Sequence, residues 1–77
     1  MDWEKENNKL IKIFVFHDFV GAIHFINKIV PYAEDLQHHP DIEIFDYKNV
    51  KITLTTHSKK KITEKDYQLA KKIDQIT

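Results

Sequence analysis

Hydrophobic residues at the start of the chain are spaced as they are in β-strands. Residues 3–6 suit a short strand, and Asn7-Asn8 suits the turn that follows it. Residues 9–16 contain LIKIFVF, which is apolar on both alternating faces and rich in β-branched and aromatic side chains. The pattern therefore predicts a hairpin whose second strand is well covered.

A helical spacing replaces this alternation after Asp18, a residue that suits an N-cap. Hydrophobic side chains recur there at three- and four-residue steps, which predicts a long amphipathic helix. They are Phe19, Ala22, Ile23, Ile26, Ile29, Val30, Ala33 and Leu36. Pro31 has no N–H to donate and is expected to kink or divide this helix. Pro40 should stop it near His39, because the residue before proline is pushed out of the helical region.

The remaining sequence predicts a second hairpin and a last helix. Residues 42–47 and 50–56 read as strands joined by Lys48-Asn49. Thr63-x-x-Asp66 resembles a capping box that opens a helix. Leu69, Ala70, Ile73 and Ile76 should face inward from that helix. The order β-β-α-β-β-α predicts one α+β domain over residues 1–77, a four-stranded antiparallel sheet with helices packed on one face.

A two-residue loop at Lys48-Asn49 would set the register of the second hairpin. Tyr47 would then face Val50, and continuing the ladder would bring Pro40 opposite His57. His39 and His57 would become neighbours, since opposed Cβ atoms lie about 4.5–5.5 Å apart. This register places Phe45, Tyr47, Val50, Ile52 and Leu54 beneath the helices, and Ile42 and Ile44 on the other face.

The stretch EDLQHHPD adds the candidate chemistry. Glu34 lies four residues before His38, so the two would share a face if the helix persists, and the carboxylate could orient the imidazole. Together with the hairpin register, this predicts that His38, His39, His57 and Glu34 converge on one corner of the sheet. Histidine gives and accepts protons near neutral pH. The residues alone thus favour general acid–base chemistry on a small molecule.

Other interpretations of these residues stay open. A single histidine at a helix end is commonly a C-cap partner, and Asp66 suits the third position of its capping box. Three imidazoles with an open fourth position would also suit zinc, although adjacent histidines such as His38 and His39 point in divergent directions.

Composition narrows the classes of function. The 77 residues contain no cysteine, which excludes disulfides and zinc-thiolate sites, and the twelve basic residues are all lysine and balance twelve acidic ones. Without arginine or a net positive charge, nucleic-acid binding is not expected. No apolar run approaches the ~20 residues that span a bilayer, and the acidic N-terminus is unlike a signal peptide, so we expect a cytoplasmic protein. The lysines at 59–61 are typical of a solvated loop.

The spacing of the polar residues resembles the signature of the pterin-4a-carbinolamine dehydratases. In that family three residues separate an acidic residue from His-His-Pro, and an aromatic residue, a histidine and an aspartate follow at fixed gaps. Here these are Glu34, His38-His39-Pro40, Tyr47, His57 and Asp66. FVFHDFVGAIHFI and VKITLTTH are similar to flanking family segments. The loop SKKKIT departs from the family, because it lacks the glycines that many members have there.

The resemblance implies both a fold and a reaction. The implied fold is the α+β sheet expected above, and the reaction is dehydration of 4a-hydroxytetrahydropterin to quinonoid dihydropterin, without metal or cofactor. His38, His39 and His57 would be catalytic, and Glu34 and Asp66 would orient imidazoles. The residues expected near the substrate are Thr55, Thr56 and Pro40. The alternative is a binding or protein-interaction module, similar to a dimerisation cofactor, that keeps the fold without the reaction.

Self-association is also expected. LIKIFVF presents apolar side chains to both faces of the sheet, and the predicted register adds Ile42 and Ile44 to the face without helices. A sheet with one open side should leave less apolar surface in water. These observations, with the resemblance to a family that assembles through its sheets, predict a homodimer or homotetramer.

Overall fold

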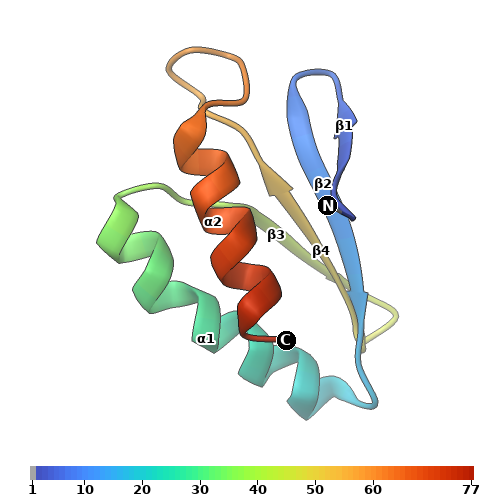
Figure 1. Cartoon of the computed structure of the whole chain (residues 1–77). Helices are drawn as coiled ribbons and strands as arrows, with labels where there is room; N and C mark the ends of the chain where they lie inside the picture. The colour runs from blue at the N-terminus through green and yellow to red at the C-terminus, as the bar shows by residue number, and fades with distance from the viewer. Residues whose placement is uncertain (1) are drawn as a thin grey trace.

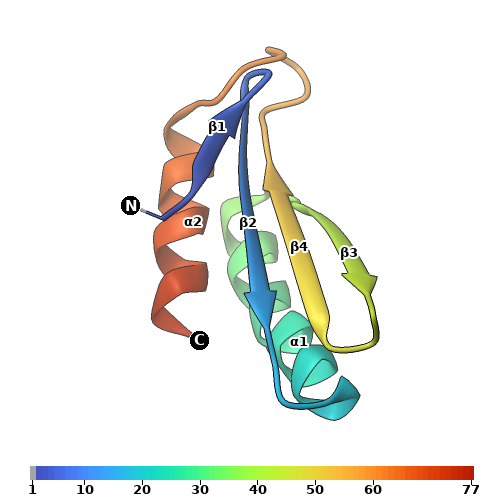
Figure 2. The ribbon, with the colours of Figure 1, turned by 90° about the vertical axis from the view of Figure 1, so that its right-hand side faces the viewer.

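A computed structural model describes residues 2–77 and contains two antiparallel hairpins, each followed by a helix (Figure 1). The elements are β1 (Glu4–Glu6), β2 (Lys9–Val15), α1 (Phe19–Leu36), β3 (Asp41–Phe45), β4 (Asn49–Leu54) and α2 (Glu64–Gln75). The strands form one sheet in the order β1-β2-β4-β3, with every neighbouring pair antiparallel. Both helices cover the same face of the sheet, and the other face is open (Figure 2). The predicted fold class and element order are confirmed.

The hydrophobic core lies between the sheet and the two helices. Because strand side chains alternate between faces, β2 and β4 each direct every second residue toward the helices. The buried residues are Trp3, Leu10, Phe14, Val50, Ile52 and Leu54 from the sheet side, and Ala22, Phe25, Ile29, Ala33, Leu69, Ala70 and Ile73 from the helices. The inward positions predicted for Leu69, Ala70 and Ile73 are confirmed.

Helix α1 begins where the sequence predicts. The Asp18 carboxylate accepts a hydrogen bond from the Gly21 N–H at 2.8 Å, which, with the neighbouring His17, lowers the pKa of Asp18. The helix does not divide at Pro31, which lies exposed within its 18 residues. Pro31 is tolerated because it lies on the exposed side of the helix, whereas Ile29 and Ala33 on the buried side pack in the core.

Trp3 joins the first hairpin to the end of α2. Its indole Nε1–H lies 3.1 Å from a carboxylate oxygen of Asp74, and Lys12 Nζ lies 2.9 Å from the other oxygen. The indole itself is 6% exposed and contacts Phe14 edge to face. Trp3 is thus a core residue that fixes the N-terminal strand on the C-terminal helix.

The β3–β4 hairpin differs from the predicted one. Phe45 pairs with Asn49, so the turn consists of Asp46, Tyr47 and Lys48, and the predicted turn at Lys48-Asn49 is wrong. Asp46 and Tyr47 adopt left-handed backbone conformations, with φ of 49° and 54°. Aspartate tolerates that conformation well. The turn was misplaced because aromatic residues such as Tyr47 are typical of strands.

The observed register moves the partner of Phe45 by three residues, from Ile52 to Asn49. An odd shift exchanges the two faces of a strand, so Phe45 lies on the open face. Ile42 pairs with Ile52 and Ile44 with Val50, which places both isoleucines on the helix-covered face and corrects the prediction for them. Ile44 packs against the core there. Ile42 stays 37% exposed, so the packing of Ile44 against the core is the apolar contact that favours this register.

Within residues 2–77, neither helix combines the length and hydropathy needed to cross a bilayer.

The turn predicts an asymmetry between two neighbouring glycine substitutions. Tyr47→Gly should raise the free energy of unfolding by roughly 1 kcal/mol, because a left-handed backbone strains any residue with a Cβ. Lys48→Gly is the matched control; Lys48 is not left-handed, so glycine should lower stability by about 0.5–1 kcal/mol. Urea unfolding followed by tryptophan fluorescence measures both. Equal destabilisation by the two variants would contradict the observed turn.

Candidate functional site

The predicted site residues lie where three elements end or begin. The chain leaving α1 passes the start of α2 on its way to β3 (Figure 1). His38 and His39 follow α1, Thr56 follows β4, and Asp66 lies in the first turn of α2. Residues that are distant in the sequence therefore meet at one end of the molecule.

A buried carboxylate holds this junction together. Asp66 is 0% exposed, and its oxygens accept hydrogen bonds from His38 Nε2 at 2.5 Å, Thr56 Oγ1 at 2.9 Å and the Thr63 N–H at 2.9 Å. The Thr56 hydroxyl proton goes to Asp66, so the Thr63 hydroxyl donates to Thr56 Oγ1 at 2.6 Å. Each donor comes from a different segment. The Thr63 bond is the predicted capping-box contact, and the other two extend beyond capping.

The contact with Asp66 sets the tautomer of His38. An ionised carboxylate only accepts hydrogen bonds, so Nε2 of His38 carries a proton and Nδ1 is the nitrogen left for another partner. The imidazole side chain is 11% exposed, which leaves it little rotational freedom. A ring held in this way can accept a proton at Nδ1 and return it.

His39 pairs with a different carboxylate in an exposed position. Its Nε2 lies 2.5 Å from a Glu34 oxygen, and the two side chains are 62% and 61% exposed. Glu34 was predicted to share a face with His38, and this assignment is wrong. The helix ends at Leu36, Gln37 adopts φ 51°, and the His38 N–H bonds the Ala33 carbonyl at 3.0 Å. The left-handed residue redirects the chain before the i,i+4 relationship can reach His38.

The predicted ladder between Pro40 and His57 does not form. Strand β3 starts at Asp41, which pairs with Thr53, and β4 ends at Leu54. His57 lies beyond this ladder. It is exposed and makes no hydrogen bond or ion pair with any of residues 2–77. His57 directly follows Thr56, whose hydroxyl donates to Asp66, so the backbone of His57 lies next to this junction.

The remaining predicted residues have separate surroundings. Thr55 is 6% exposed, and its hydroxyl donates to the Asn8 carbonyl at 2.9 Å, which fixes the end of β4 to the turn between β1 and β2. Pro40 is half-buried and lines a shallow, mainly apolar cavity of about 190 Å³. His39 and Glu34 contribute polar groups to its rim, and Ile29, Val30, Ala33 and Ile42 supply apolar walls.

Among residues 2–77, no group of three or more histidine or carboxylate side chains is arranged to hold a metal ion. The two imidazole–carboxylate pairs stay separate, because Nε2 of each ring binds its own carboxylate.

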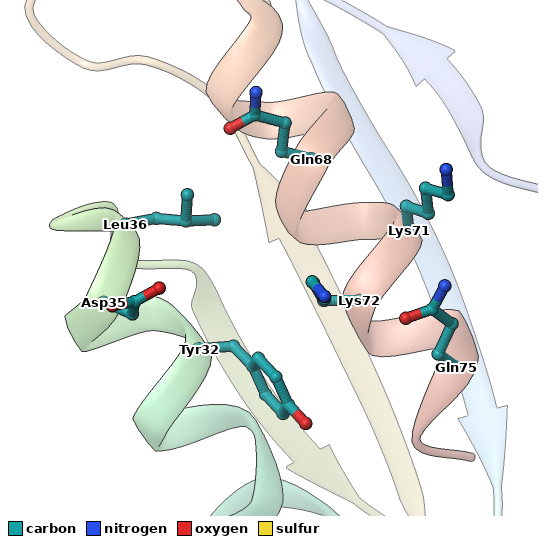
Figure 3. A pocket seen from close by; sticks show the side chains of 7 residues that line it. All are labelled: Tyr32, Asp35, Leu36, Gln68, Lys71, Lys72 and Gln75. Atoms are coloured by element: carbon teal, nitrogen blue, oxygen red, sulfur yellow. The ribbon is translucent and has the colours of Figure 1, made fainter.

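Sequence reasoning missed the groove between the two helices. Figure 3 shows the side chains of α1 and α2 that line this groove, with Tyr32 and Leu36 of α1 directed toward α2. The groove has a volume of about 270 Å³. Lys72 lies 5.8 Å from the centre of the Tyr32 ring, and Asp35, Leu36, Gln68, Lys71 and Gln75 complete the lining. The hydrophobic periodicity of the sequence cannot predict this groove, because its lining comes from two helices that only the packed structure brings together. It contains no histidine, so acid–base chemistry favours the Asp66 junction.

Sequence comparison matches residues 1–76 to the family model described as pterin 4 alpha carbinolamine dehydratase. A protein of Sulfolobus acidocaldarius named "Putative pterin-4-alpha-carbinolamine dehydratase" is 47% identical over 74 residues, which are 96% of this chain and 80% of that protein. A protein of the same name from Trichodesmium erythraeum is 49% identical over 76 residues, 99% of this chain and 81% of its own length.

Two solved structures share the fold. The transcriptional coactivator/pterin dehydratase of Brucella melitensis superposes with a TM-score of 0.89 at 37% identity, over 96% of this chain and 80% of that chain. A pterin dehydratase-like protein identified as a RuBisCO assembly factor in the alpha-carboxysome gives a TM-score of 0.75 at 23% identity, over 96% and 84%.

The buried network predicts a large difference between two carboxylates. Asp66→Ala should lower the free energy of unfolding by about 3 kcal/mol or more, because it leaves buried donors without an acceptor, each at about 1–3 kcal/mol. Glu34→Ala, which removes an exposed pair, should change it by less than about 1 kcal/mol. Urea unfolding of both variants provides the measurement. Similar losses would mean that the Asp66 bonds do not stabilise the junction.

Proposed function

Because this chain belongs to the pterin 4 alpha carbinolamine dehydratase family, we propose that it dehydrates a 4a-hydroxytetrahydropterin to the quinonoid dihydropterin. The observation that carries the proposal is the buried carboxylate of Asp66, which holds His38 at the position where the family signature requires an imidazole. The relatives and the pairing of two adjacent histidines with separate carboxylates support the same reaction.

The proposed step needs one proton donor and one proton acceptor. The bond between C4a and the hydroxyl oxygen breaks, and a general acid protonates the departing oxygen to give water. A general base removes the proton from N5, and the electron pair of that N–H bond forms the C4a=N5 double bond. No electron leaves the substrate, so the step needs no oxidant. Afterwards the general acid regains a proton from water and the general base releases one, which restores the starting protonation of the protein.

We assign the proton transfers to the three histidines. Asp66 orients His38 so that Nδ1 can face the substrate, and Glu34 does the same for the more mobile His39. His57 has no carboxylate partner within residues 2–77 and is free to move toward a bound ring. Either face of the pterin ring could present the hydroxyl group, so the division into acid and base stays open.

Substrate binding is proposed for Thr55, Thr56 and Pro40. The hydroxyl protons of Thr55 and Thr56 are already donated, to Asn8 and Asp66, and both main-chain groups of Thr56 are bonded to residues 59–61. Thr55 would therefore present its main-chain groups to the polar edge of a pterin, and Thr56 would help to hold that edge of the site in place. Pro40 and the apolar walls of its cavity offer a surface for the flat ring.

Histidine substitutions test the reaction. His39→Ala and His57→Ala should fold normally, since both side chains are exposed, and each should lower kcat by ~10²–10⁴ because a general acid or base is lost. His24→Ala, exposed on α1 away from the junction, is the matched control and should retain full activity. The measurement is absorbance-monitored dehydration of a synthetic 4a-hydroxypterin, with the buffer rate subtracted.

Two outcomes would count against the proposal. If both histidine variants kept wild-type turnover, the assignment of proton transfer to these histidines would be wrong. A wild-type protein no faster than buffer would favour the alternative function, a binding or protein-interaction module on the same fold. Exposed apolar side chains on α1, Phe19, Val20 and Val30, are the observation that favours this alternative.

We further propose that the protein forms a homodimer or homotetramer. The open face of the sheet carries Ile13 at 51% and Val15 at 68% exposure, and Ile11 and Phe45 lie on the same face. Strand β3 is also an unpaired edge. Apolar side chains on an open face gain about 1.5–3 kcal/mol each when fully buried, and two-fold pairing is the commonest way to bury them.

Sedimentation equilibrium tests this proposal. At micromolar concentration the protein should sediment as a multiple of its 9.2 kDa chain. Ile13→Lys with Val15→Lys should shift it toward monomer if the open face is the interface, whereas Val20→Lys with Val30→Lys on α1 should not. If only the α1 variant became monomeric, the interface would involve α1 and not the open face of the sheet. A monomeric wild-type protein would refute self-association.

A further inference from the structure

A short loop of lysines is anchored directly on the candidate site. The Thr56 N–H donates to the Lys61 carbonyl at 3.0 Å, and the Thr56 carbonyl accepts from the N–H groups of Lys59 and Lys60 at 3.1 and 2.8 Å. Thr56 thus closes the loop at its base, and its hydroxyl reaches Asp66, which holds His38. The position of the lysines relative to the site is therefore set by backbone hydrogen bonds.

The charges of this loop are not neutralised within the described chain. Lys59, Lys60 and Lys61 are exposed, and none of them forms an ion pair with a carboxylate of residues 2–77. Lys12, by contrast, lies 2.9 Å from Asp74. In a chain with no net charge, three adjacent free ammonium groups produce a local positive field around this loop, whose base is Thr56.

The backbone of Lys60 provides an independent observation. Its φ of 53° lies in the left-handed region, where glycine or asparagine fits with less strain than lysine. Backbone strain of this kind occurs more often at functional sites than elsewhere, so Lys60 is not explained by backbone preference alone. A solvated loop with no role would be more stable with glycine at this position.

We propose that Lys59, Lys60 and Lys61 bind an anionic group, phosphate or carboxylate, on the side chain of the pterin substrate. This inference rests on the proposed dehydratase function and adds to it the chemical class of the substrate. Lysine suits this use because its ammonium is a compact charge on a flexible stem, able to follow a mobile substituent. Exposed charges act mainly on encounter and binding, so KM should change more than kcat.

The test compares three synthetic 4a-hydroxytetrahydropterins with the same ring. One carries a neutral dihydroxypropyl side chain, one its phosphate monoester, and one a carboxylate. We expect kcat/KM to be about tenfold higher for an anionic substrate at low salt, and the preference to fade in about 0.5 M NaCl as the lysine charges are screened.

Matched variants assign the preference to the loop. Replacing Lys59, Lys60 and Lys61 by glutamine should abolish the preference and leave the neutral substrate unaffected. Replacing Lys28, Lys48 and Lys71 by glutamine removes the same charge elsewhere and should preserve it. Lys60→Gly should weaken the preference while the thermal midpoint stays the same or rises, which a purely structural lysine would not do.

The results separate this inference from the reaction itself. Preference for the phosphate alone or for the carboxylate alone supports the inference and identifies the group, and an equal preference for both supports recognition of negative charge in general. Equal kcat/KM for neutral and anionic substrates, or a preference that survives the loop variant, would overturn it while leaving the dehydratase proposal intact. Failure to dehydrate any of the three pterins would refute the dehydratase function, and this inference with it.

Discussion

The hydrogen bonds of the buried Asp66 carboxylate hold together the junction of α1, β4 and α2. A charged group without solvent is costly unless its oxygens are fully paired, and Asp66 obtains its partners from the end of α1, the end of β4 and the start of α2. The same bonds that satisfy the charge therefore fix the relative positions of three elements. Stability and the orientation of His38 have one physical origin here.

The two adjacent histidines show how burial separates residues of the same type. His38 is enclosed and bound to a rigid carboxylate, whereas His39 and Glu34 form a pair in water. An exposed pair contributes little stability, and its members keep their freedom to move. The left-handed Gln37 produces this difference, because it turns the chain so that consecutive side chains enter different surroundings. A fixed imidazole beside a mobile one suits a reaction in which protons are both supplied and removed.

Hairpin register links the core to the molecular surface. Pairing Ile44 with Val50 adds an apolar side chain to the layer beneath the helices, and it necessarily turns Phe45 to the open face. The cost is a left-handed Asp46 and Tyr47 in the turn. The two left-handed residues cost about 1–2 kcal/mol each, and the strain is offset in part by the apolar contacts of Ile44 and in part by the backbone pairing of β3 with β4. The same register adds Phe45 to the open face, where Ile11, Ile13 and Val15 of β2 already lie.

Local patterns in the sequence were enough to predict the element order, the Asp18 cap, the capping box of Asp66 and the inward face of α2. These depend on side chains within a few residues of one another, so periodicity and capping chemistry report them directly. The motif residues were also identified from their spacing. Their partners were not: Glu34 binds His39, Asp66 binds His38, and His57 lies outside the ladder that was expected to place it. Those contacts depend on a hairpin register and a helix end that are decided by the burial of Ile44 and by one left-handed residue. Only the packed structure, where these small energies compete, determines which carboxylate each histidine meets.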